Sequence, residues 1–171
     1  MKMRRFVGVA GIVSLIAVGF CGLLFAQGKA TPRQVMQKVR QAVSVLEKSK
    51  GANLAPFDNP KGPWVFGDSY IIVQNCANGT IASHPFVPKL VGKKAAGLQD
   101  VKGNFFFVQL CQAGKKPGGG WVQYWFPKPG QKTASRKLSY ALQVPGTSMV
   151  AIAGIYSNTL KLADLNKTVS K

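Results

Sequence analysis

The sequence predicts an α+β fold, in which a long N-terminal helix covers one face of a five-stranded antiparallel sheet and a lid-like connection covers the other. Three observations support this class. An amphipathic helical pattern occupies residues 31–51, the later strand-like segments are short, and a connection of unusual length begins at residue 86. The order of one helix, two strands, the connection and three strands gives one domain with a single sheet.

The N-terminal helix is predicted over residues 31–51 because its first turn carries strong start signals. Thr31 suits the N-cap, Pro32 suits the first helical position, and Gln34 completes a capping-box pattern. Apolar side chains then recur at helical spacing: Val35, Val39, Ala42, Val43 and Leu46. Gly51 is typical of a helix end. We therefore expect one apolar stripe that packs against the sheet.

A β-hairpin is predicted from residues 69–74 and 80–83. Asn78 and Gly79 lie between these segments, and this pair favours the positive φ angles of a two-residue type I′ turn. The second strand must stop at His84, because the proline that follows has no N–H for the strand ladder.

The rest of the chain is predicted as a connection, three strands and a tail. Residues 86–103 form the connection, whose length is typical of a lid over a functional site. Residues 104–113 fit either a helix or a strand by pattern, and we favour a short helix. The three strands are expected at residues 121–126, 137–144 and 149–156. Ser157 is a candidate cap for a final short helix within residues 158–171.

The first 26 residues are expected to lie outside the folded domain. Residues 1–5 are basic and residues 6–26 are almost wholly apolar without a charge, which is typical of a signal peptide. This pattern predicts a periplasmic or secreted protein. The apolar run is also close to the ~20 residues that span a bilayer, so an uncleaved anchor in the inner membrane is the alternative.

The chain is strongly basic. It has 23 Lys and Arg residues against 5 Asp and Glu residues, with a net charge of +18. Such a charge attracts anions, and it biases any pocket toward acids. Nucleic acid is a poor partner for an exported protein. A structural protein that holds anionic lipid or a polyanion at its lysine surface, with a degenerate pocket, is the alternative function.

Several segments occur in an order that resembles one family. They are GPWVFGDSYIIV, NGTIASHPFVPKLVGK with Asp100 a little later, GGGWVQYWFPKPG, KLSYALQVPGT and AIAGIY. Together, over residues 57–157, they resemble the single Cache domain of the second type, an extracytoplasmic sensor module related in shape to PAS domains. The resemblance implies the same sheet and long helix. It also implies a small pocket between the sheet and the connection, usually for small organic acids.

The resemblance implies a sensor in signal transduction and chemotaxis. Because the chain ends soon after Tyr156, we expect it to act without its own output domain, through a membrane histidine kinase or chemoreceptor. The helix of this family often pairs with a second copy, so a homodimer through residues 31–51 is a further expectation. No cofactor is implied.

A carboxylate pocket needs donors that converge and walls that exclude water. The candidate ligand-binding residues are Trp64, His84, Trp121, Tyr124, Lys137 and Tyr140. Lys137 and Tyr140 are three residues apart, so they lie on opposite faces of a strand, and without a bulge only one of them reaches the ligand. For His84 the alternative is a structural role, in which the ring caps a backbone group.

Other chemistry has little support in the sequence. Cys76 and Cys111 are the two cysteines that follow the signal segment, and outside the cytosol they form either a disulfide or two separate buried thiols. One histidine and two cysteines are too few for structural zinc, so no metal site is expected. The motifs HExxH and GxSxG are absent, and five acids with one histidine leave few catalytic options. We therefore expect no catalytic residues and no enzyme.

Overall fold

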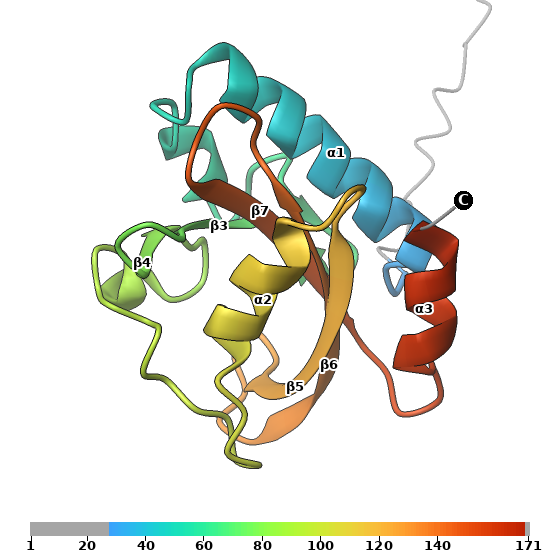
Figure 1. The fold of residues 1–171 in the computed structure, drawn as a ribbon. Helices are drawn as coiled ribbons and strands as arrows, with labels where there is room; N and C mark the ends of the chain where they lie inside the picture. Colours follow the sequence, from blue (N-terminus) through green and yellow to red (C-terminus); the bar gives the residue numbers. More distant parts are fainter. Residues whose placement is uncertain (1–27, 170–171) are drawn as a thin grey trace, which may run out of the picture.

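The computed structural model describes residues 28–169 and confirms the predicted α+β class (Figure 1). The five-stranded sheet has the order β4-β3-β7-β6-β5, and all neighbouring strands are antiparallel. Its strands are β3 (Ile72–Asn75), β4 (Thr80–Ser83), β5 (Gly120–Pro127), β6 (Ala134–Gln143) and β7 (Met149–Tyr156). A two-stranded ribbon, β1 (Val65–Phe66) and β2 (Ser69–Tyr70), precedes them.

The expected signal peptide or anchor, residues 1–26, lies outside the described residues. Within residues 28–169, no helix has the length and apolar character needed to cross a bilayer.

Helix α1 (Pro32–Lys48) begins with the predicted capping box. The backbone N–H of Gln34 donates to Thr31 Oγ1 at 3.3 Å, and the backbone N–H of Thr31 donates to Gln34 Oε1 at 2.9 Å. These two bonds satisfy N–H groups that the helix itself leaves unpaired. The predicted apolar stripe is buried against β6 and β7, so α1 covers the central part of one face of the sheet.

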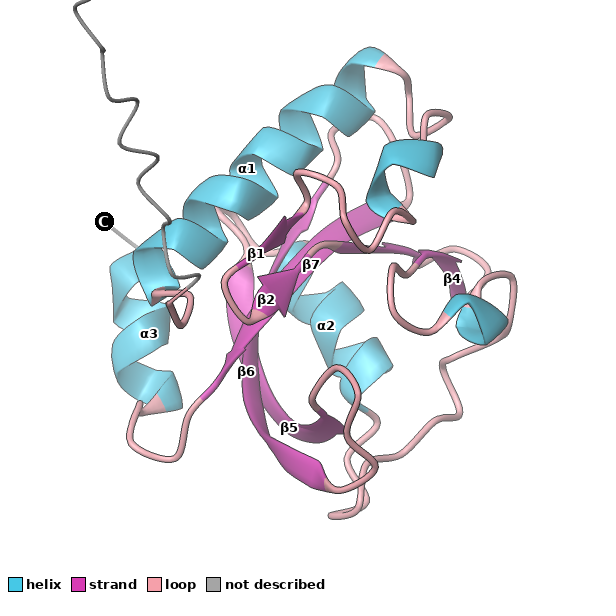
Figure 2. Ribbon diagram, turned by 180° about the vertical axis from the view of Figure 1, so that it is seen from behind, coloured by secondary structure: helices cyan, strands magenta, loops and turns pink. Residues whose placement is uncertain are grey.

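Alternation along the strands divides the interior into two cores. On β7, Ala151 and Ala153 face α1, whereas Val150 and Ile152 face the opposite side. Helix α2 (Phe106–Gly114) covers that opposite side; it lies in front of the sheet in Figure 1 and behind it in Figure 2. The helical interpretation of residues 104–113 is therefore confirmed.

The long connection is fastened to the domain along its length. It contains a 3₁₀ turn, η2 (Pro88–Leu90), and it bridges to β4 at Ile81 and Thr80. At its far end Asp100 accepts backbone N–H groups from Lys102 at 2.8 Å and from Trp125 of β5 at 2.9 Å. The connection therefore starts beside β4 and ends beside β5, which places it over the α2 side of the sheet.

The predicted type I′ turn is wrong. Gly79 has a φ of 70°, but Asn78 does not have a positive φ, and the turn spans four residues, 76–79. Asn78 instead accepts two hydrogen bonds from Thr80 through Oδ1. The extra length has a physical cause, because the backbone N–H of Cys76 still donates to Ser148 at 2.8 Å, and its sulfur forms a disulfide with Cys111 of α2.

Two side chains cover the outer edge of β5. The backbone N–H of Trp121 donates to Asn166 Oδ1 at 2.8 Å, and that of Trp125 donates to Asp100. Asn166 belongs to α3 (Leu162–Val169), which begins later than predicted. Ser157 does not cap α3, because its Oγ accepts N–H groups from residues 159 and 160 within the preceding turn.

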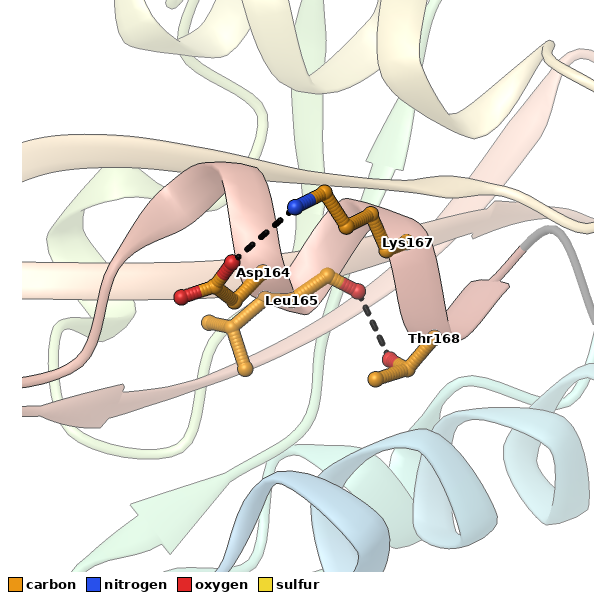
Figure 3. Close-up of polar contacts among 4 residues, drawn as sticks. All are labelled: Asp164, Leu165, Lys167 and Thr168. Atoms are coloured by element: carbon orange, nitrogen blue, oxygen red, sulfur yellow. Dashed lines mark hydrogen bonds and ion pairs between the residues drawn. The ribbon is translucent and has the colours of Figure 1, made fainter.

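Helix α3 also carries two local contacts that hold its own turns together (Figure 3). Lys167 pairs with Asp164 at 3.4 Å, and the Thr168 hydroxyl donates to the backbone oxygen of Leu165 at 2.6 Å. Leu165 is buried and forms part of the core on the α1 side. The residues after β7 are thus folded onto the domain.

Candidate ligand-binding site

A buried lysine lies at the centre of the candidate site. Lys137 of β6 is directly opposite Tyr124 of β5 and Tyr156 of β7 in the strand register, so the three side chains share one row on the α2 side of the sheet. The Lys137 side chain is 4% exposed, and its Nζ donates to the Tyr70 hydroxyl at 3.1 Å. The ring centres of Tyr70, Tyr156 and Phe126 lie 4.3, 4.9 and 5.6 Å from Nζ.

The charge of Lys137 has no acidic partner. The one ion pair found within residues 28–169 joins Lys167 and Asp164, far along the chain. Burial of an ammonium costs several kcal/mol, whereas a cation–π contact returns about 2 kcal/mol when it is desolvated. Burial therefore lowers the pKa of Lys137 from 10.5 to about 7, and the negative charge of Asp68 opposes this change only in part.

His84 follows β4 and has two distinct ring nitrogens. Nδ1 accepts the backbone N–H groups of Phe86 at 3.2 Å and Val87 at 3.1 Å. Because Nδ1 accepts, the proton of the neutral ring is on Nε2, which has no partner among the described side chains. Burial, and then the charge of Lys137, lower the pKa of His84 to about 3. The ring therefore braces the start of the connection and keeps one N–H donor.

Two hydroxyl groups lie in the same layer. The oxygen atoms of Tyr124 and Ser139 are 2.9 Å apart, and the Tyr124 ring stacks on Phe106 of α2 with a centre-to-centre distance of 4.6 Å. Burial raises the pKa of Tyr124, so its hydroxyl stays protonated. On β7, Gly154 makes room for this layer: a Cβ atom there would lie 2.1 Å from Ser139 Oγ and 2.9 Å from Lys137 Cε.

A hollow of about 360 Å³ opens beside this cluster. It is lined by Val65, Gly67, Asp68, Ser69, Tyr70, Phe86, Lys128, Pro129, Gln131 and Tyr156. Its volume lies at the lower end of the ~300–1,000 Å³ that is usual for small-molecule sites. Lys137 does not line the hollow, but it contacts Tyr70 and Tyr156, which do.

A larger groove of about 750 Å³ shares Asp68, Lys128 and Tyr156 with this hollow. Its one arginine, Arg136, donates to the Gln123 side chain and to the backbone oxygens of residues 157 and 160. Those bonds occupy the guanidinium in holding β6 to the chain that follows β7. We therefore place the candidate site in the smaller hollow, because two residues of its lining, Tyr70 and Tyr156, contact the buried Lys137.

The structure brings together His84, Tyr124 and Lys137, but not the other three candidates. Trp64, Trp121 and Tyr140 lie on the α1 side of the sheet. Trp64 stacks on Phe57 at 4.6 Å between ring centres, and Tyr140 lies 5.6 Å from Trp121 and donates to the backbone oxygen of Gly118. Alternation along β5 and β6 accounts for this separation.

Several residues of the cluster were not predicted: Tyr70, Phe86, Phe126, Ser139 and Tyr156. Ser139 had a usable signal, because it is two residues from Lys137 on one strand and must share its face. Tyr156 also had one, since it is a polar aromatic residue that ends an otherwise apolar strand. Tyr70 had none, because its contact with Lys137 depends on how β2 crosses the sheet.

Comparison with known proteins identifies the family of this chain. The family model for the single Cache domain 2 matches residues 23–169. A methyl-accepting chemotaxis protein from Vibrio parahaemolyticus has a similar structure, with a TM-score of 0.61, 21% identity, and coverage of 74% of this chain and 88% of that chain. The periplasmic sensor domain of a chemotaxis protein matches with a TM-score of 0.58, 23% identity, and coverage of 72% and 93%.

A third similar structure is a Cache chemosensory domain solved for its recognition of carboxylic acids, with a TM-score of 0.58, 22% identity, and coverage of 73% of this chain and 88% of that one. At these identities the likeness establishes the fold alone. The family match covers most of the chain and includes α1 and α3. The chain therefore belongs to the single Cache domain 2 family, whose members are extracytoplasmic ligand-sensing modules.

Proposed function

We propose that this domain senses a small carboxylic acid, which it binds as the carboxylate in the hollow beside Lys137. The observation that carries the proposal is a buried lysine amine with no acidic partner. Such a group is stabilised when an anion supplies the missing charge. Carboxylic acid recognition by a similar Cache domain supports the same assignment.

The surrounding groups suit one carboxylate. We assign Lys137, the Tyr70 hydroxyl and His84 Nε2 as the donors for its two oxygens; Tyr70 lines the hollow and contacts Lys137, whereas Lys137 and His84 are not part of the lining. Hydrogen bonds to a charged group contribute about 1.5–3 kcal/mol each. Phe86 and Tyr156 offer apolar contact to the rest of the molecule. At ~1.5 kcal/mol per heavy atom, an acid of about four heavy atoms reaches affinities no tighter than tens of micromolar.

The same groups disfavour related ligands. A second carboxylate would have no second buried cation, and the ammonium of an amino acid would be repelled by the like charge of Lys137. Asp68 is the one acidic residue that lines the hollow, and Lys128 lines it as well. The proposed ligand class is therefore small monocarboxylates.

The proposed setting is the periplasm, reached by an exported chain that is either released or held by its N-terminal apolar segment. There the bound acid would be reported to a membrane histidine kinase or chemoreceptor. The structural neighbours support this setting because they are sensor domains of chemotaxis proteins. The exposed face of α1 is the proposed contact for a second copy.

Calorimetry and thermal shift test the proposal directly. Acetate, propionate, lactate and pyruvate should each be compared with succinate and glycine, using the wild type and Lys137→Met. The proposal expects at least one monocarboxylate to raise the melting temperature of the wild type but not of the variant. Stabilisation of both proteins to the same extent, or of neither, would refute it.

The basic surface gives a second candidate function, namely binding to anionic lipid or a cell-wall polymer. The observation behind it is the excess of basic residues: lysines and arginines greatly outnumber acids, and the described part of the chain has one ion pair, so most basic side chains there have no acidic partner. Binding through exposed lysines should fall steeply as salt rises, because such charges are screened over about 10 Å at 0.1 M salt. Binding of acetate in the hollow should change little.

A further inference from the structure

The amine of Lys137 has an environment that does not hold a charge in the empty domain. Its surroundings consist of the Tyr70 hydroxyl and the faces of three aromatic rings. An ammonium has three N–H donors, and one of them has a partner here. A neutral amine leaves less hydrogen-bonding capacity unmet, and burial penalises only the charged form.

The other titratable and charged groups around Lys137 do not change this conclusion. They are Tyr70 of β2, Tyr124 of β5, Tyr156 of β7, His84 after β4, Asp68 before β2, and Lys128 in the lining of the hollow. Burial raises the pKa of each of these tyrosines and lowers that of His84, so all four are neutral at physiological pH. The residues that α2 contributes to this core are apolar. Asp68 is the one group that favours the charged lysine.

A bound carboxylate would reverse the balance. An opposite charge within about 4–6 Å favours the charged form of an amine and raises its pKa. The pKa of Lys137 in the empty domain is about 7, so a higher value in the filled site means that the filled site binds more protons above neutral pH. The proton comes from the solvent, and the carboxylate then pairs with an ammonium that forms as it binds.

We propose, building on the carboxylate site proposed above, that Lys137 is largely uncharged in the empty domain above neutral pH and takes up one proton with each acid that binds. The domain therefore reports the acid and the external acidity together. Its affinity for a carboxylate is nearly constant below neutral pH and falls by up to about tenfold per pH unit above it.

Calorimetry with propionate measures this uptake. At about pH 8, titrations in two buffers of different ionisation enthalpy should give binding enthalpies that differ by the value expected for nearly one proton. Lys137→Arg keeps a permanent charge, so any propionate binding that it retains should be independent of pH. Lys116→Met, which removes an exposed lysine, should behave as the wild type. Equal affinities for the wild type at about pH 6 and about pH 9 would overturn the inference and leave the carboxylate site intact.

A measurement without ligand keeps the two proposals separate. The ¹³Cε resonance of Lys137, assigned by its loss in Lys137→Met, is followed against pH in the empty domain. The inference expects a midpoint near neutrality, well below those of the exposed lysines. If the Lys137 resonance instead titrates with the same midpoint as the exposed lysines, above about pH 10, the inference is overturned, whether or not any acid binds.

Discussion

The Nζ atom of Lys137 lies 3.1 Å from the Tyr70 hydroxyl oxygen and 4.3 Å from the centre of the same ring. The contact joins β6 at the middle of the sheet to the short ribbon that precedes it. Tyr70 therefore accepts a hydrogen bond from the amine on one side and lines the hollow as well. One tyrosine links the buried charge to the space where a ligand would enter.

Replacement of Lys137 by Met should stabilise the empty domain while it removes ligand binding. Methionine fills a similar volume without a charge, and replacement of buried charges by apolar groups commonly adds on the order of 1–4 kcal/mol. Because the pKa of Lys137 is lowered to about 7, the gain is largest below pH 7 and disappears as pH rises toward 10.5. Urea unfolding at several pH values measures it. A less stable variant would mean that the aromatic contacts outweigh the burial of the amine.

His84 should make the protein sensitive to acid. With a pKa of 6.5 in the unfolded chain and about 3 in the folded one, its neutral form is retained only by the fold, so stability falls as pH drops from 6.5 toward 3. The full effect is on the order of 5 kcal/mol. His84→Asn supplies an oxygen in place of Nδ1 and does not titrate, so it should lose this pH dependence.

The control for His84→Asn is His84→Ala. Alanine leaves the backbone N–H groups of Phe86 and Val87 without an acceptor, at a cost of about 1–3 kcal/mol for each buried donor. Unfolding at neutral pH should therefore rank the wild type and His84→Asn together, above His84→Ala. Equal stability of the two variants would show that Nδ1 does not hold the connection.

Gly154→Ala on β7 should displace the site residues Ser139 and Lys137 of the neighbouring strand β6. The added Cβ would overlap Ser139 Oγ and crowd the Lys137 side chain, and overpacking of this kind costs typically about 1–3 kcal/mol. The affinity of Gly154→Ala for propionate should be lower than that of the wild type. Gly97→Ala is the matched control, because Gly97 has open space around its Cβ position and no positive φ. Equal melting temperatures for the two variants would contradict the close approach of β6 and β7 at this point.

Removal of the disulfide should increase local opening of α2 more than that of the sheet. The bond between Cys76 and Cys111 closes a loop with a sequence separation of 35 residues, which corresponds to about 4 kcal/mol in the chain-entropy model. A Cys76→Ser, Cys111→Ser double variant should have a clearly lower melting temperature, with faster amide exchange in α2 than in β6. Uniform loss of protection in both elements would indicate that α2 and the sheet unfold as one unit.

The local features of the fold could be predicted from the sequence, because each depends on nearby residues. The Thr31 and Gln34 pair sets the start of α1, and alternation sets the two faces of each strand. The same rule separates Lys137 from Tyr140. The turn at Asn78 and Gly79 was not predictable in this way, since its length depends on contacts of Cys76 with Ser148 and Cys111.

Only part of the candidate site could be predicted from the sequence, because the site also depends on contacts between residues that are distant in the chain. Lys137 is one lysine among many in the sequence, and only the strand register shows it in a row with Tyr124 and Tyr156. Trp64 and Trp121 looked equally suited to a pocket wall, but they are core residues under α1. Residue type pointed to donors and walls, whereas their convergence depends on pairings between strands that are distant in sequence.

The covering of the outer edge of β5 has a consequence for how crowded molecules behave. An uncovered strand at the rim of a sheet is a template on which another chain can pair and start a fibril. Here Asn166 and Asp100 hold the backbone N–H groups of Trp121 and Trp125, so an incoming strand would first have to displace both side chains. This protection opposes the pairing of β5 with a strand of a neighbouring molecule, even where the local protein concentration is high.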